Sequence, residues 1–203
     1  MNKKQIFIIH GGKTFPNRKD YLNHLRNKKV FLEKKKKWRN EYLDKELGNK
    51  FKIIRPRMPC KKNARYEEWK IYFERYFPFL KDGIILIGYS LGGIFLAKYL
   101  SENKFSKKIS GIYLIATPFD DSINKEKLCG GFRLKDNLSL IEENCQNIKL
   151  FFSEDDDIVP VSHAQKYKNK LKESEVIICK NKNGHFQVSE FPELVEYIKK
   201  ENK

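Results

Sequence analysis

The chain has 203 residues, of which 40% are hydrophobic and 13% aromatic, so it can bury a core without disulfides or a structural metal. This composition excludes an intrinsically disordered protein, although 33% of the residues are charged. The formal net charge of +16 comes from 42 Lys and Arg against 26 Asp and Glu, and a charge of this sign favours anionic partners over cationic ones.

The positive charge is concentrated near the amino terminus. Residues 1–50 contain 15 Lys and Arg against 5 Asp and Glu, and such a field attracts nucleic acid or an anionic membrane. These basic residues lack the interleaved Gly and aromatic residues of a nucleic-acid module, and lysine is abundant along the whole chain. A general lysine bias is the preferred interpretation, and a polyanion-binding site is the alternative.

The amino-terminal residues and the cysteines indicate a soluble cytoplasmic protein. The sequence MNKKQIFIIH has four consecutive apolar residues, whereas the core of a signal peptide has about 7 to 15. No apolar run approaches the length of about 18 residues that crosses a bilayer. The cysteines are too far apart for a CxxC pair, so we expect reduced thiols and no metal site at Cys60, Cys129, Cys145 and Cys179.

Short apolar runs alternate with segments of helical periodicity along the chain. Such runs are typical of strands covered on both faces, and their alternation with helices predicts a parallel sheet with right-handed crossovers. In chain order, we expect strands at 5–10, 51–55, 83–88, 110–116, 148–153 and 175–179. We expect helices near 20–28, 33–47, 65–77, 91–100, 163–172 and 191–200. The predicted fold class is α/β, with about six mostly parallel strands in a three-layer sandwich.

Two connections are unusually long. Residues 14–50 include the run KKKK at 34–37, which we interpret as a solvated face. Residues 117–147 are interrupted by proline and paired glycines, and we expect them to lie over a site as a partial lid. No linker or internal repeat breaks the pattern, so residues 1–203 are predicted to form a single domain with these two insertions.

The sequence GYSLGG at 88–93 stands between a predicted strand and a predicted helix. Gly88, Gly92 and Gly93 surround Ser90, which gives the pattern G-x-S-x-G. A turn of this kind holds the serine in a strained conformation, with its hydroxyl above the edge of the sheet. The alternative is a serine in a glycine-rich loop with no chemical role. The position between strand and helix favours a nucleophile.

A serine hydroxyl needs a base, and four histidines are available. His185, in the sequence NGHF, follows the last predicted strand and so reaches the same edge of the sheet as Ser90. We interpret His10 as structural, His24 as a surface residue, and His163 as a helix cap or surface residue. His185 is therefore the predicted base.

The sequence SEDDDIVP at 153–160 places carboxylates at the same edge, after the fifth predicted strand. A carboxylate fixes the tautomer of the base and stabilises its cation. The chain order is then Ser, Asp, His, the order that is typical of α/β-hydrolases. From the residues alone, Asp155, Asp156 and Asp157 remain alternatives for the acid.

Taken together, these blocks resemble those of the α/β-hydrolases, in particular the small serine hydrolases that include a retinoblastoma-binding protein. The resemblance rests on IIHGG (8–12), YEEW (66–69), LIGYSLGG (86–93), SEDDDIVP (153–160) and NGHF (183–186), which span nearly the whole chain in the right order. It implies a compact α/β-hydrolase fold with strand order 2-1-3-4-5-6 and without an amino-terminal hairpin.

The resemblance also implies roles for particular residues. In the family, the catalytic acid stands four residues before the proline of D-x-x-V-P, which implies Asp156, and Asp155 and Asp157 are then expected to face solvent. The backbone N–H groups of Gly12 and Leu91 are implied as the oxyanion hole. The implied activity is hydrolysis of a small ester, thioester or amide through an acyl-enzyme, with no cofactor and no metal.

The chain departs from the family in two places, namely its long basic insertion and Asp157, which stands where proline is common. Two other classes of function remain as alternatives. One is a catalytically silent hydrolase fold that binds a protein partner. The other is a module that binds nucleic acid or an anionic membrane through its basic amino-terminal half.

Overall fold

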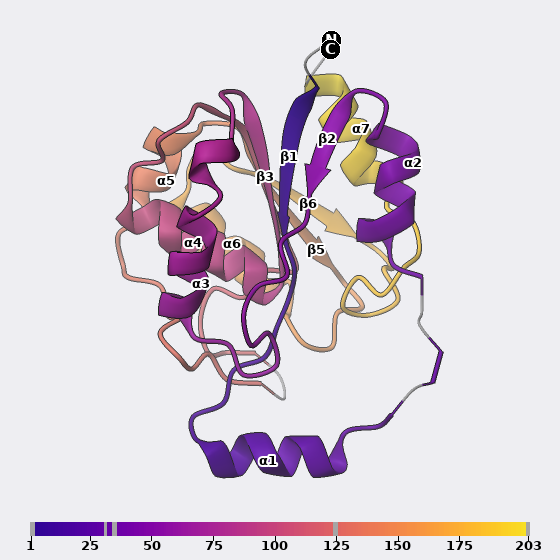
Figure 1. The fold of residues 1–203 in the computed structure, drawn as a ribbon, viewed down its shortest axis with the longest axis vertical. Helices are drawn as coiled ribbons and strands as arrows, with labels where there is room; N and C mark the ends of the chain where they lie inside the picture. The colour runs from indigo at the N-terminus through magenta and orange to yellow at the C-terminus, as the bar shows by residue number, and fades with distance from the viewer. Residues whose placement is uncertain (1–2, 31, 34–35, 124–125, 202–203) are drawn as a thin grey trace.

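The computed structural model describes residues 3–30, 32–33, 36–123 and 126–201. Six parallel strands form one sheet in the order β2-β1-β3-β4-β5-β6 (Figure 1). Both the fold class and the strand order are confirmed, and each predicted strand lies within two residues of an observed one. The strands are β1 (Lys4–Ile9), β2 (Phe51–Ile54), β3 (Ile84–Tyr89), β4 (Ile109–Ile115), β5 (Ile148–Ser153) and β6 (Glu175–Cys179).

Alternate residues of the central strands point into two different cores. Phe7 and Ile9 of β1 pack in one core, whereas Ile6 and Ile8 pack in the other. Successive side chains of a strand point to opposite faces, so a continuous apolar run is what a strand covered on both faces requires. The sheet is thus the middle of three layers, as predicted.

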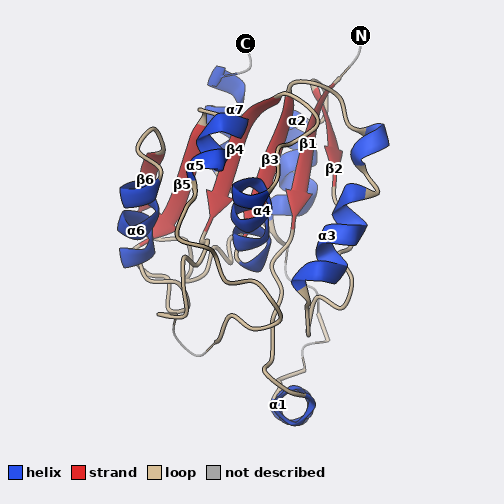
Figure 2. Cartoon of the chain, turned by 90° about the vertical axis from the view of Figure 1, so that its left-hand side faces the viewer, coloured by secondary structure: helices blue, strands red, loops and turns tan. Residues whose placement is uncertain are grey.

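Helices cover both faces of the sheet. Figure 2 shows one group on the near face: α3 (Tyr66–Glu74), α4 (Leu91–Glu102), α5 (Ser139–Asn144) and α6 (Ser162–Lys170). The other face is covered by α2 (Leu43–Leu47) and α7 (Pro192–Glu201). A short 3₁₀ turn, η2 (Phe77–Phe79), follows α3. The central helix α4 follows β3 directly, which sets the position of Ser90 between them.

The predicted helix over residues 33–47 is wrong at its start, since residues 33, 36 and 37 are not helical. The observed helical structure begins at Trp38, with a π-helical turn, η1 (Trp38–Tyr42), and continues as α2. The backbone of Asn40, within η1, is non-helical (φ −106°, ψ −116°). Residues 34–35 of the lysine run lie outside the described residues. Burial of Trp38 fixes where the helical structure starts.

The helix α1 (Arg18–Asn27) stands apart from the sheet (Figure 1). It has no buried residue, and its amino terminus is capped by the side chain of Asn17, which accepts a hydrogen bond from the N–H of Asp20 at 2.9 Å. Its existence agrees with the helix predicted near 20–28. Because it contributes nothing to either core, α1 depends on the capping and on its connections at both ends.

Trp38 attaches the end of the first insertion to the body of the protein. Its ring is fully buried and lies 5.4 Å from the ring of Phe191 and 6.1 Å from the ring of Tyr89, edge to face in both cases. We expect Trp38→Ala to lower the free energy of unfolding by about 3–5 kcal/mol, because it leaves a cavity between these rings. Urea unfolding followed by circular dichroism measures the loss.

Trp38→Phe is the matched control. The indole Nε1 of Trp38 is buried without a hydrogen-bond partner in the described part of the chain, so phenylalanine keeps an aromatic ring and loses no hydrogen bond. We expect it to cost less than half of what Trp38→Ala costs. Equal losses of unfolding free energy in the two variants would show that the aromatic ring at position 38 does not contribute to stability.

The four cysteines are free thiols. Within the described residues, no helix has both the length and the apolar character that crossing a membrane requires. Across the same residues, no group of three or more His, Cys, Asp and Glu side chains is arranged to hold a metal ion.

Candidate active site

Ser90 occupies the sharp turn between β3 and α4. Its backbone is left-handed (φ 54°, ψ −122°), and its N–H donates to the carbonyl oxygen of Ile115 in the neighbouring strand at 2.9 Å. A positive φ is strained for a residue with a side chain and is held here by the strand before it and the helix after it. The turn therefore fixes the direction of the Ser90 side chain.

The glycines after Ser90 are required by close packing. A Cβ on Gly92 would lie 2.3 Å from the carbonyl oxygen of Ile9, and one on Gly93 would lie 1.8 Å from Oγ1 of Thr117. Real Cβ atoms do not come this close to backbone or to a fixed side chain. The motif thus lets α4 start against the ends of β1 and β4, and this explains the glycines that surround the serine in the sequence.

Three side chains from separate loops meet at this turn. Oγ of Ser90 lies 2.8 Å from Nε2 of His185, and Nδ1 of the same ring lies 2.8 Å from Oδ2 of Asp156. A carboxylate only accepts hydrogen bonds, so Nδ1 carries the proton and Nε2 accepts from the serine hydroxyl. The Asp156 side chain is completely buried, and that of His185 is 8% exposed. The structure thus brings together the three residues that the resemblance selected.

The Asp156 carboxylate is held by its own loop. Its Oδ1 accepts hydrogen bonds from the N–H groups of Ile158 at 2.9 Å and Val159 at 3.0 Å, which leaves Oδ2 for His185. The four-residue spacing from Asp156 to Pro160 therefore has a physical reason, because residues between these two positions donate their N–H groups to the Asp156 carboxylate.

The expectation that Asp155 faces solvent is wrong. Its carboxylate accepts hydrogen bonds from the N–H groups of Lys182 at 3.0 Å and Gly184 at 2.8 Å, and from the hydroxyl of Ser153. Burial alone would raise the pKa of Asp155, but these hydrogen bonds outweigh it and lower the pKa. Asp155 joins the loop that carries Asp156 to the loop that carries His185. Asp157 is exposed, as expected.

The sequence contained only an indirect signal for this role of Asp155. Three consecutive aspartates after a strand suggest one functional acid with solvated neighbours. Which aspartate faces the loop that carries His185 depends on the path of residues 180–185. Along the chain, α6 and β6 separate this segment from the aspartates.

The loop after β1 packs directly on the nucleophile turn. A Cβ on Gly11 would lie 3.1 Å from Cβ of Ser90, and one on Gly12 would lie 2.9 Å from a methyl carbon of Leu91. Leu91 is the first residue of α4, and the first N–H groups of a helix have no acceptor within it. Gly12, Ser90 and Leu91 line the same cavity. The two residues predicted for the oxyanion hole thus lie beside the Ser90 side chain.

The other histidines lie outside this cluster. The ring of His10 donates from Nδ1 to the carbonyl oxygen of Gly11 at 2.7 Å and accepts at Nε2 from the N–H of Met58 at 3.0 Å, which is a structural role. His24 lies on α1, against the ring of Phe15.

The expectation for His163 is wrong, because this histidine is completely buried and is not a surface residue. Its Nδ1 accepts a hydrogen bond from the N–H of Phe119 at 2.9 Å, and Nε2 donates to the carbonyl oxygen of Ser122 at 3.1 Å. Burial lowers the pKa of His163, in agreement with a neutral ring that both donates and accepts. It holds the start of the second insertion against α6.

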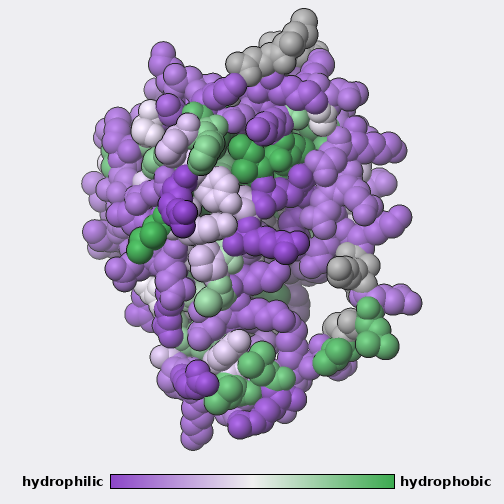
Figure 3. Space-filling view, in the orientation of Figure 1, coloured by the Kyte–Doolittle hydropathy of each residue, from purple (hydrophilic) through white to green (hydrophobic). Residues whose placement is uncertain are grey.

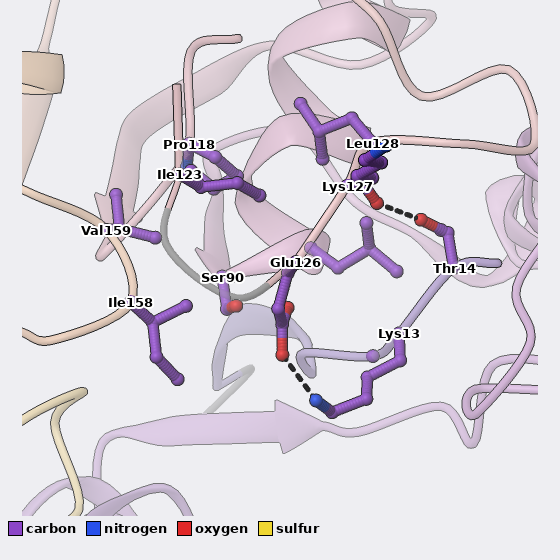
Figure 4. A pocket seen from close by; sticks show the side chains of 12 residues that line it. Lys13, Thr14, Ser90, Pro118, Ile123, Glu126, Lys127, Leu128, Ile158 and Val159 are labelled. Carbon is purple, nitrogen blue, oxygen red and sulfur yellow. Dashed lines mark hydrogen bonds and ion pairs between the residues drawn. The ribbon is translucent and has the colours of Figure 1, made fainter. Parts of the chain in front are cut away.

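Residues of the second insertion lie over Ser90. Figure 4 shows the Ser90 hydroxyl with Glu126 beside it, Ile158 and Val159 on one side, and Lys13 and Thr14 on the other. The cavity that remains has a volume of about 10 Å³, which is room for about one water molecule. Substrate entry therefore requires that part of this cover moves.

Two contacts hold the cover to the loop after β1. The ammonium of Lys13 lies 2.5 Å from the carboxylate of Glu126. The hydroxyl of Thr14 donates to the carbonyl oxygen of Lys127 at 2.6 Å and accepts from the N–H of Cys129 at 2.9 Å. We call Thr14 and these two backbone groups the Thr14 clasp. No sequence pattern identified it, since the partners are more than a hundred residues apart.

Comparisons with known proteins agree with this fold. The chain is similar over nearly its whole length to the ydeN gene product from B. subtilis, at 19% identity and a TM-score of 0.75, with 98% of each chain covered. It is similar to a lipase-esterase related protein from Clostridium acetobutylicum at 14% identity and a TM-score of 0.60, with 97% of this chain and 93% of that chain covered. A third similar structure is that of a carboxylesterase from a thaumarchaeon of the genus Nitrososphaera, at 13% identity and a TM-score of 0.60, covering 98% and 89%.

At these identities, the structural likeness establishes the α/β-hydrolase fold. The search of curated proteins gave no match. The narrower likeness to hydrolases that include a retinoblastoma-binding protein stays a prediction. The model of the family described as serine hydrolase matches residues 33–199, which is most of the chain and includes Ser90, Asp156 and His185. The chain therefore belongs to the serine hydrolase family.

Proposed function

We propose that this hydrolase cleaves a small carboxylic ester, thioester or amide through a Ser90–His185–Asp156 triad and an acyl-enzyme. The observation that carries the proposal is the unbroken chain from Oγ of Ser90 through the imidazole to the Asp156 carboxylate, with 2.8 Å at each step. The carboxylesterase and lipase-esterase names of the matched structures favour an ester among the three substrate classes.

In the first half of the reaction, Oγ of Ser90 attacks the substrate carbonyl carbon while Nε2 of His185 takes the hydroxyl proton. The ring becomes a cation that donates from both nitrogens, and the buried Asp156 carboxylate stabilises it. The negative charge that forms on the carbonyl oxygen is held by the N–H groups of Leu91 and Gly12. Such preorganised donors contribute roughly 3–4 kcal/mol to transition-state stabilisation.

In the second half, His185 returns the proton to the leaving group, and the bond between the carbonyl carbon and the leaving group breaks. A water molecule then takes the place of the leaving group. His185 removes a proton from this water as its oxygen attacks the acyl carbon. Collapse of the second tetrahedral intermediate releases the acid and restores the Ser90 hydroxyl. Every step uses groups of this chain and water alone.

The cavity suggests the kind of acyl group. Its apolar side chains are Leu91, Pro118, Ile123, Leu128, Ile158 and Val159. Its volume of about 10 Å³ is too small for a long acyl chain while the cover is in place. Entry of any acyl group displaces part of the cover, and a short acyl group needs a smaller displacement than a long one, so short, apolar acyl groups are the proposed substrates.

Labelling with a fluorophosphonate probe, followed by assays on p-nitrophenyl esters from acetate to octanoate, tests the proposal. We expect labelling at Ser90 and the highest kcat/KM for the shortest esters. A folded protein that neither labels nor hydrolyses any ester, thioester or amide of the series would instead be a catalytically silent hydrolase fold.

The Thr14 clasp leads to a prediction about chain length. Thr14→Val keeps the shape of the side chain but removes the hydroxyl that joins the carbonyl of Lys127 to the N–H of Cys129. We expect kcat/KM for octanoate to rise several-fold relative to acetate, since a hydrogen bond contributes about 1 kcal/mol to the closed form. The acetate ester is the internal control. An unchanged ratio between the two esters would show that the clasp does not limit entry.

A further inference from the structure

A second, larger pocket lies behind the catalytic loop. It has a volume of about 880 Å³ and is separated from the Ser90 cavity by the loop after β1, since His10 and Gly11 line this pocket whereas Gly12 lines the cavity. We call it the basic pocket, because among the described residues five cationic side chains line it against a single carboxylate, that of Glu33. The cations are Lys37, Arg39, Arg55, Arg57 and Lys61.

One of these cations is already used by the fold. The guanidinium of Arg55 donates from Nε to the carbonyl oxygen of Arg39 at 2.7 Å and from Nη1 to the carboxylate of Asp44 at 3.0 Å. Arg55 therefore holds the backbone of η1, and with it the position of the Arg39 side chain, at the wall of the pocket.

The other cations have unused hydrogen-bonding capacity. The guanidinium of Arg39 stacks over the ring of Tyr89, 4.7 Å from its centroid, and Nη1 of Arg39 is buried without a hydrogen-bond partner in the described residues. Arg57 and Lys61 are exposed, and neither forms an ion pair with a described residue. A buried donor without a partner is costly, so a ligand that accepts from Arg39 is favoured.

The cations of the basic pocket affect the pKa of His10, which also lines it. Burial lowers the pKa of His10, and the cations of Lys61 and Arg39 lower it further, against the opposing effect of the hydrogen bond to Gly11. His10 therefore stays neutral and contributes no charge of its own. The concentration of positive charge comes from the lysine and arginine side chains alone.

We propose that the basic pocket binds a small molecule that carries one or more phosphate groups. Arginine forks and lysine ammonium groups are the side chains that pair best with phosphate oxygens. A volume of about 880 Å³ lies within the range of small-molecule sites, roughly 300–1,000 Å³. The hollow shape favours a compact anion over an extended polymer. This binding goes beyond hydrolysis and does not depend on it.

The basic pocket also touches the loop that carries His185. Gln187 lines the pocket and donates to the carbonyl oxygen of His185 at 2.9 Å, and the hydroxyl of Tyr89, beneath Arg39, donates to the same oxygen at 2.6 Å. A phosphate compound in the pocket is thus placed next to the support of the catalytic histidine. The face of the molecule that Figure 3 shows is mostly hydrophilic, with smaller hydrophobic patches.

Calorimetric titration with inorganic pyrophosphate tests the proposal on the full chain at low salt. We expect saturable binding of one equivalent, and a Kd about tenfold higher for each of Arg57→Gln and Lys61→Gln, because each removes a charge-assisted contact. Arg75→Gln is the matched control, since Arg75 is an exposed arginine on the other side of the sheet, after α3, and does not line the pocket. Its Kd should equal that of the unchanged protein.

Further titrations show whether the pocket prefers a free phosphate anion or a phosphorylated organic compound, and whether binding depends only on general surface charge. Inorganic phosphate, a nucleoside triphosphate and single-stranded oligonucleotides of two lengths are titrated in the same way. Tighter binding of the triphosphate than of pyrophosphate, with the same two variants weakened, supports a phosphorylated organic compound. Tighter binding of pyrophosphate supports a free phosphate anion.

Three results would overturn the proposal: no binding of any phosphate probe, equal weakening by Arg75→Gln, or affinity that rises with oligonucleotide length. The last two would mean that general surface charge, or a nucleic-acid surface, accounts for the binding. Arg39→Met, checked by circular dichroism, adds an independent arm, since it should abolish pyrophosphate binding while it keeps the packing against Tyr89. A folded Arg39→Met protein that binds pyrophosphate normally would also contradict the proposed phosphate site.

Discussion

Ser90→Ala is expected to abolish fluorophosphonate labelling and to reduce kcat for p-nitrophenyl acetate by a factor on the order of 10⁶. The hydroxyl of Ser90 is the group that His185 contacts in the cavity, and without it no acyl-enzyme forms. Alanine accepts the same backbone conformation about as well as serine, so the turn and the melting temperature should be retained. Labelling is followed by intact-mass spectrometry and hydrolysis by absorbance.

Ser101→Ala is the control for this experiment. Ser101 lies near the end of the same helix, where its hydroxyl donates only to the carbonyl oxygen of Lys98, so its loss should leave labelling and hydrolysis unchanged. Hydrolysis that persists above about a hundredth of the original rate in a folded Ser90→Ala protein would mean that another group is the nucleophile.

Asp156→Asn is expected to reduce kcat by a factor on the order of 10⁴. An amide in this place can donate a proton toward Nδ1 of His185, which favours the wrong tautomer and removes the charge that stabilises the imidazolium. The fold should survive, because Oδ1 still accepts from the N–H groups of Ile158 and Val159. The measurement compares kcat with fluorophosphonate labelling rate and with the midpoint of urea unfolding.

The two neighbouring aspartates provide graded controls. Asp157→Asn changes an exposed side chain, and its effect on kcat should stay within a few-fold. Asp155→Asn weakens the contacts to Lys182 and Gly184, so we expect a loss of stability of about 1–3 kcal/mol together with a smaller loss of kcat than in Asp156→Asn. A deep loss of kcat in Asp155→Asn or Asp157→Asn, with Asp156→Asn nearly normal, would move the acid to another position.

Local patterns in the sequence carried the prediction of the sheet. The runs at 6–9 and 84–87 are apolar at every position, as strands covered on both faces require, so each segment indicates a strand without reference to the rest of the chain. The first insertion was harder to predict. Residues 33–47 have a helical composition, yet the helical structure starts at Trp38. The start is set by tertiary contacts, because the ring of Trp38 packs against the rings of Tyr89 and Phe191.

The sequence by itself determined the α/β class, the chain order of Ser90, an aspartate and His185, and the edge of the sheet at which they stand, since each of these depends on short-range pattern and on the rule that the ends of parallel strands share one edge. The choice of Asp156 among three aspartates came from the resemblance to the α/β-hydrolases. Only the tertiary structure decided what the neighbours do. Asp155 ties two loops, His163 is buried beneath the second insertion, Thr14 clasps the cover, and five cations converge behind the catalytic loop. Each of these depends on distances between segments far apart in the chain, and the packing of helices against the sheet sets those distances.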